Sequence, residues 1–222
     1  MDKKGRSVFI GKGDPFEIEK EANSLFGGLA KNPDNFDENS IRHYMLMAGL
    51  GVDCSGFVAN VLAEFLKEKK LGSIRKHIKP EMKTLLTPLT FLLRPITNIS
   101  ANVLTNDING IKIDNLNKVM PGDLIRFGRK HVALIGEIKK IDGILKEITY
   151  FHSTCDYLDQ QGVRKGSIII SDHKFPLEKQ VWNETYRGKN WSYQDYISAK
   201  EGDRGIRRIK TLASFYSKHS TI

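Results

Sequence analysis

Residues 53–66 read DCSGFVANVLAEFL, and this stretch decides the fold. Its apolar residues recur three, four, seven and eight positions apart, which is the spacing of one face of a buried amphipathic helix. Asp53 is the residue type that caps a helix N-terminus, so Cys54 stands where a loop becomes a helix. Backbone N–H groups at a helix start stabilise an anion and favour thiolate over thiol. Cys54 is therefore a candidate nucleophile.

The sequence on both sides of this helix predicts an α+β domain. Upstream, a helix is expected over residues 15–25, with Asp14 as its N-cap. Downstream the apolar period changes, and strands are expected over 123–127, 131–140, 144–153, 163–171 and 205–212. Helices that precede a strand meander predict an antiparallel sheet with the helices packed on it.

Two of the six histidines are brought together by the expected hairpin. If Asp142-Gly143 forms the two-residue turn, His152 lies opposite Ala133, one step along the same face from His131. If the turn is Ile141-Asp142, the two histidines face each other directly. In both registers the imidazoles share one face, with about 5 to 8 Å between Cβ atoms. Such a pair suits a general base and the group that orients it.

Several motifs, in this order along the chain, resemble the NlpC family of papain-like cysteine peptidases of the bacterial cell wall. The motifs are Asp53–Val58, Pro121–Phe127, His131–Ile135, Phe151–Ser153, Gly162–Arg164 and Gly205–Arg208. The resemblance implies a papain-like α+β fold and hydrolysis of peptide-stem amide bonds in peptidoglycan. The usual target is the link between γ-D-glutamyl and a diamino acid.

The resemblance also implies roles for individual residues. Cys54 would be the nucleophile, His131 the base and His152 the residue that orients the base, although Ser153 or Thr154 could replace His152 if the register shifts. A second set would bind substrate: Asp53 and Ser55 would line the pocket for the substrate's free amine, and Tyr44 would lie near the oxyanion. This thiol mechanism requires no cofactor.

Composition is compatible with this interpretation. The 222 residues are 40% hydrophobic and 27% charged, which predicts a single domain over 1–222 with an insertion at about 71–118. The net charge of +9 suits an acidic stem peptide or an anionic wall polymer. A basic stripe interleaved with aromatic residues is missing, so nucleic acid is not an expected partner. Oligomeric state is left open.

The insertion carries an apolar segment, 85–104, which would be an extra helix or loop packed on the core, a substrate-covering lid or a lipid contact. The uncharged stretch 84–93 contains Pro88 and ends at Arg94, so stable membrane insertion is not expected. No secretory signal is visible near the start. We therefore expect a soluble protein that begins in the cytoplasm, with export by another route left open.

Alternatives to the peptidase remain. Two cysteines are too few for a disulfide scaffold and indicate a reducing compartment. Cys54, His131, His152 and Cys155 include zinc-ligand types, but Cys155 is expected on the opposite strand face from His152, so no metal site is predicted.

The same thiol chemistry could serve an acyltransferase, a thioesterase or a deamidase acting on a lipid or protein. A catalytically inactive wall-binding module is the alternative from another class.

Overall fold

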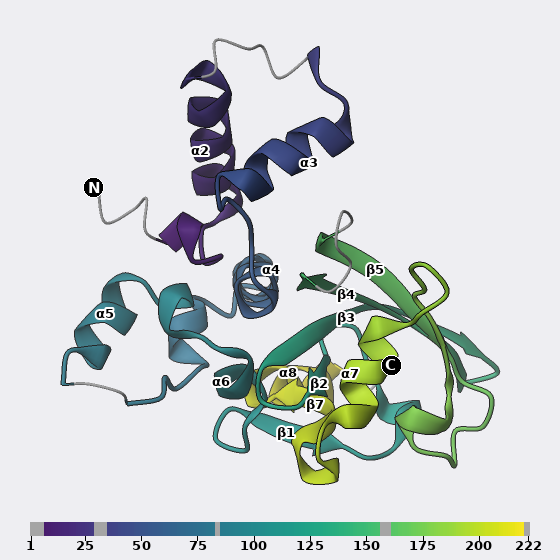
Figure 1. Ribbon diagram of the computed structural model, residues 1–222. Helices are drawn as coiled ribbons and strands as arrows, with labels where there is room; N and C mark the ends of the chain where they lie inside the picture. The colour runs from purple at the N-terminus through teal and green to yellow at the C-terminus, as the bar shows by residue number, and fades with distance from the viewer. Residues whose placement is uncertain (1–6, 29–34, 83–84, 156–160, 220–222) are drawn as a thin grey trace.

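The computed structural model describes residues 7–28, 35–82, 85–155 and 161–219, which form the α+β arrangement expected from the sequence (Figure 1). Its principal helices are α2 (Pro15–Gly28), α3 (Glu38–Met47), α4 (Cys54–Glu68), α5 (Thr87–Leu93), α6 (Ala101–Thr105), α7 (Trp191–Ser198) and α8 (Lys210–His219). Its strands are β1 (Gly110–Ile113), β2 (Leu124–Phe127), β3 (His131–Ile141), β4 (Ile144–Thr154), β5 (Gly162–Ile169), β6 (Val181–Asn183) and β7 (Arg204–Ile209).

The strands form one sheet in the order β1-β7-β2-β3-β4-β5-β6, and every neighbouring pair is antiparallel. Strands β2 to β6 follow one another as a meander, and β7 returns between β1 and β2. The predicted antiparallel sheet is confirmed. The expected strand over 205–212 is wrong in its second half, because the chain turns into α8 at Lys210 and Leu212 packs from that helix into the core.

The β3–β4 hairpin has the first of the two expected turns. Asp142 and Gly143 both have left-handed backbone angles, with φ of 51° and 75°, and Ile141 lies opposite Ile144. The alternative turn at Ile141-Asp142 is therefore wrong. Each strand carries one bulge: β4 has an extra residue at Lys146 and β3 has one at Gly136. The two shifts in strand pairing cancel, so beyond both bulges the strands regain the register that the turn sets.

Both faces of the sheet are buried. Along β2 and β3, side chains alternate between a core covered by α4, α6 and α8 and a second core on the other face. Leu124, Val132 and Leu134 belong to the first core, and Ile125, Ala133 and Ile135 belong to the second. The second core also holds the aromatic residues Tyr150, Trp182 and Tyr196. Helix α4 thus packs on the sheet through the first core, with Cys54 at its first position.

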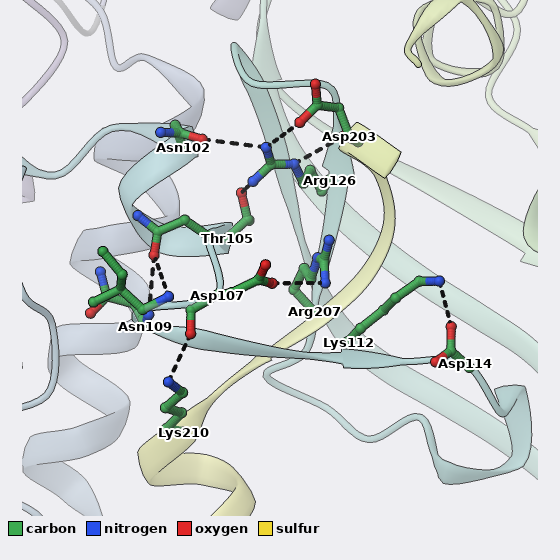
Figure 2. Close-up of polar contacts among 12 residues, drawn as sticks. Asn102, Thr105, Asp107, Asn109, Lys112, Asp114, Arg126, Asp203, Arg207 and Lys210 are labelled. Carbon is green, nitrogen blue, oxygen red and sulfur yellow. Dashed lines mark hydrogen bonds and ion pairs between the residues drawn. The ribbon is translucent and has the colours of Figure 1, made fainter. Parts of the chain in front are cut away.

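Residues 71–118 contain one helix that is largely exposed, α5, and one that is buried in the body of the protein, α6. Helix α5 projects from the body on the left of Figure 1, and its leucines are largely exposed, among them Leu89 and Leu93. Helix α6 is buried, and Arg126 of β2 joins it to the start of β7. Figure 2 shows this guanidinium bonded to Thr105, Asn102 and Asp203 at distances of 2.8 to 3.3 Å. The expectation of a segment packed on the core therefore holds for α6 and for Phe91 of α5, which belongs to the first core while the leucines of α5 stay exposed.

Within the described residues, no helix is both long enough and apolar enough to cross a bilayer.

Candidate active site

The first turn of α4 is built as the sequence predicts. Asp53 is the N-cap, and its side chain accepts a hydrogen bond from the backbone N–H of Gly56. Gly56 is required at this position because a Cβ atom there would collide with the carbonyl oxygen of Gly11, whose chain crosses the helix start. Cys54 is the first residue of the helix, and its thiol lies beside the residue that precedes β3.

The half-buried Cys54 thiol lies along the backbone that flanks His131. Its Sγ is 3.6 Å from the carbonyl oxygen of Lys130. Burial raises the pKa of this thiol above its ordinary value, and the neighbouring Asp53 carboxylate raises it further, while the backbone N–H of Val132 and the Lys12 ammonium oppose the rise. The thiol is therefore protonated at rest, and it needs a base to become a nucleophile.

His131 is held by His152. Nε2 of His131 and Nδ1 of His152 are 2.8 Å apart, so the hairpin brings together the two imidazoles that the sequence singled out. The Phe127 ring on β2 packs against both of them, edge-on to His131 at 5.0 Å and stacked on His152 at 6.3 Å between ring centroids. This aromatic cover keeps the pair on the side of the second core.

Glu184, which follows β6, is a site residue that sequence reasoning missed. Its buried carboxylate accepts hydrogen bonds from Nε2 of His152 at 2.9 Å and from the hydroxyls of Tyr150 and Ser192, each at 2.7 Å. Nε of Arg164 lies 3.0 Å from the same carboxylate. Burial alone would raise the pKa of Glu184, but the bonds from His152, Ser192 and Tyr150 outweigh it and lower the pKa to about 2. The carboxylate is ionised.

An ionised Glu184 determines that the facing nitrogen of His152 carries a proton. Nε2 of His152 donates this proton to the carboxylate. Nδ1 of the same ring and Nε2 of His131 share a hydrogen bond across the 2.8 Å contact. Nδ1 of His131 takes no part in this contact. The two imidazoles and the carboxylate thus form one continuous hydrogen-bonded chain.

The electrostatics keep His131 neutral in the resting protein. Burial, together with the neighbouring His152, lowers the pKa of His131 to about 3, and the more distant Glu184 charge opposes this. Both the thiol and the imidazole are therefore uncharged at rest. The two groups therefore do not form a thiolate–imidazolium pair at rest.

The other expected site residues lie in different surroundings. Asp53 and Ser55 contact the ammonium of Lys12. Tyr44 packs its ring against Phe26 and Phe36, between α2 and α3, with centroids 6.0 and 5.4 Å away. The Tyr44 ring thus takes part in an aromatic cluster with these two phenylalanines.

Ser153 and Cys155, the other residues near the end of β4, have contacts or exposure different from those of His152. Ser153 donates to the carbonyl oxygen of Val52 and so ties β4 to the loop before Cys54, while His152 makes the bond to His131. Cys155 is an exposed free thiol just beyond β4. Among the residues that the structure describes, no three histidine, cysteine or acidic side chains gather as metal ligands would.

No family model, curated protein or solved structure matches this chain.

Proposed function

We propose that this protein is a papain-like cysteine peptidase of the NlpC type, which hydrolyses amide bonds in the peptide stems of peptidoglycan. One observation carries the proposal. Cys54, at a helix start, contacts the carbonyl oxygen of the residue before His131, Nε2 of His131 is bonded to His152, and His152 is anchored on a buried carboxylate. A nucleophile, its base and an orienting group are the parts that thiol-dependent acyl transfer needs.

The first half of the reaction forms an acyl-enzyme. Nδ1 of His131 takes the proton of the Cys54 thiol as Sγ bonds to the substrate carbonyl carbon. The carbonyl oxygen becomes an oxyanion, stabilised by the backbone N–H of Cys54 at the helix start. His152 and Glu184 stabilise the imidazolium that forms on His131. The intermediate collapses when the C–N bond breaks and the imidazolium gives its proton to the leaving amine.

The second half releases the acid. Neutral His131 takes a proton from a water molecule while the oxygen of that water attacks the thioester carbon. The C–S bond then breaks, and the thiolate of Cys54 recovers a proton from His131. The peptide carboxylic acid leaves, and the site returns to its resting state without a cofactor.

The test is mass spectrometry of defined muropeptides incubated with the wild type, Cys54→Ala and Cys155→Ala. Cys155→Ala is the matched control because it removes the exposed thiol, which takes no part in the site. We expect cleavage by the wild type and Cys155→Ala and none by Cys54→Ala, and the product masses identify the bond. Cleavage by Cys54→Ala would contradict the assignment of the nucleophile.

A second candidate is the same chemistry on an acyl group carried by a lipid, as in a thioesterase or acyltransferase. The exposed leucines of α5 favour it, because exposed apolar side chains grouped on a protruding segment are typical of contacts with lipid or protein. Release of fatty acid from acyl thioesters, with muropeptides left intact, would favour this candidate over the peptidase.

A further inference from the structure

A lysine side chain from the N-terminal segment lies beside the nucleophile. Nζ of Lys12 donates to Oγ of Ser55 and to the carbonyl oxygen of Ile99 at 2.7 Å, and it lies 3.1 Å from Oδ1 of Asp53. Only 9% of the Lys12 side chain is exposed. The residues on either side of Cys54 therefore both contact this ammonium.

The backbone around Lys12 is fixed against the start of α4. The carbonyl oxygen of Gly11 accepts the N–H of Asp53 at 3.0 Å, and that of Gly13 accepts the side-chain amide of Asn60 at 3.0 Å. Gly11 has a left-handed φ of 73°, and a Cβ atom there would collide with Asp53. Lys12 is thus directed at Asp53 and Ser55 by its own chain.

The groups around Nζ form a site for a primary ammonium ion. A lysine ammonium has three N–H donors, and here it meets three acceptors: a carboxylate, a hydroxyl and a carbonyl oxygen. A buried ammonium is stable only when it is paired and hydrogen-bonded in this way. With Lys12 in place, all three acceptors already contact one ammonium.

We propose that Lys12 is a specificity-determining residue, which fills a primary-ammonium site next to Cys54 and so excludes substrates that bring a free amine to that side of the thiol. The inference rests on the proposed peptidase function and deepens it. The preferred substrates are peptides whose amine beside the cleaved segment is acylated. A free ammonium would have to displace Lys12 or lie against it, at a cost in like-charge repulsion.

Chemical rescue tests the ammonium site without any need for catalysis. Lys12→Ala removes three methylene groups and the ammonium, a shape that propylammonium reproduces. We expect the midpoint of thermal unfolding to fall in Lys12→Ala and to be restored saturably by propylammonium. Tetramethylammonium, which is charged but has no N–H donor, should not restore it. Lys20→Ala, which removes an exposed lysine of α2, is the matched control and should not respond.

Equal responses to propylammonium in the wild type, Lys20→Ala and Lys12→Ala would overturn the ammonium site. If Lys12→Ala folds only when propylammonium is present, that requirement is itself the rescue. Lys12→Met keeps an apolar chain in the same space, so it serves as a folded variant that should lose stability without gaining a response to propylammonium.

Specificity is tested with two stem peptides that differ only in whether the N-terminal amine is free or acetylated. We expect the wild type to favour the acetylated peptide by at least about tenfold in kcat/KM, and Lys12→Ala and Lys12→Met to lose this preference. Faster cleavage of the free-amine peptide by the wild type would overturn the inference. If neither peptide is cleaved, the proposed function fails, while propylammonium rescue still decides whether the ammonium site exists.

Discussion

Nε2 of His152 lies 2.9 Å from Oε1 of Glu184, and each of these side chains is only 1% exposed. A carboxylate this deeply buried persists as an anion because His152, Tyr150, Ser192 and Arg164 all point donors at it. Its charge fixes a proton on Nε2 of His152, and Nδ1 of the same ring is hydrogen-bonded to Nε2 of His131. The orientation of the proposed base therefore depends on a residue on the far side of β4 and β5.

Replacing this charge should slow catalysis without unfolding the protein. We expect Glu184→Gln to lower kcat/KM on the cleaved muropeptide by about 100-fold, because a neutral amide no longer fixes the His152 tautomer or stabilises the imidazolium. The pH profile of kcat/KM should also shift. Glu178→Gln, which alters a carboxylate bonded to Arg204 away from the histidines, is the matched control. Equal activity in the two variants would remove Glu184 from the mechanism.

The neutral state of His131 predicts a loss of stability in mild acid. Its pKa is about 3 in the folded protein and 6.5 ordinarily, so between these values the unfolded chain binds a proton that the folded chain does not. The stability that the neutral His131 contributes is thus complete above pH 6.5 and declines as the pH falls. Glu184, with its pKa lowered from 4.5 to about 2, adds a second decline only below pH 4.5.

The interval from pH 6.5 to 4.5 therefore isolates the contribution of His131. Thermal unfolding midpoints measured across it should fall in the wild type and fall much less in His131→Gln. His43→Gln, at an exposed position on α3, should behave as the wild type does. Parallel pH curves for all three proteins would show that His131 is not held neutral.

A buried ion pair joins the residue before β2 to β7 and should dominate the stability of this part of the sheet. Nε and Nη2 of Arg208 bond the two oxygens of the fully buried Asp123 at 2.6 and 2.8 Å. Asp123→Ala leaves the guanidinium buried without its counter-charge, and we expect it to cost about 3–5 kcal/mol in urea unfolding. Asp114→Ala breaks the exposed pair with Lys112 seen in Figure 2 and should cost less than about 1 kcal/mol. Similar losses in the two variants would contradict the importance of burial.

The space around Glu184 depends on a glycine in β5. A Cβ atom at Gly166 would collide with the Tyr150 ring and come within 2.9 Å of Oε2 of Glu184. We expect Gly166→Ala to destabilise the protein by about 1–3 kcal/mol and to reduce activity by displacing the carboxylate. Gly202→Ala, where a Cβ atom would meet open space, should change neither quantity. Thermal unfolding and muropeptide cleavage of both variants give the answer, and a fully active Gly166→Ala would refute the prediction.

Much of the site is encoded locally and could be predicted. Asp53 and the apolar spacing after it specify a capped helix that begins at Cys54. The turn at Asp142-Gly143 needs two left-handed residues, which only a few residue types accept readily, so its register also brings His131 and His152 together. Each of these features is determined by residues close together in the sequence.

The residues that the sequence did not reveal act at a distance. Glu184 follows a strand of three residues, and no periodic pattern distinguishes it from the other acidic residues. Lys12 is one of many lysines and arginines, and only the folded chain brings it to Asp53 and Ser55. Tyr44 was expected at the site from its position in the chain, but its ring packs with Phe26 and Phe36. Such contacts depend on tertiary packing, which a single sequence does not display.

The paired bulges at Gly136 and Lys146 make the meeting of the two histidines a question of parity. One bulge alone would move His152 to the opposite face of the sheet from His131, and the second bulge moves it back. The number of residues between the histidines is therefore free to change in steps of two, by lengthening the hairpin arms, without separating the imidazoles. A single inserted residue is tolerated only with a compensating one. Relatives of this chain would thus keep the same parity in the number of residues between their two histidines, even where the number itself differs.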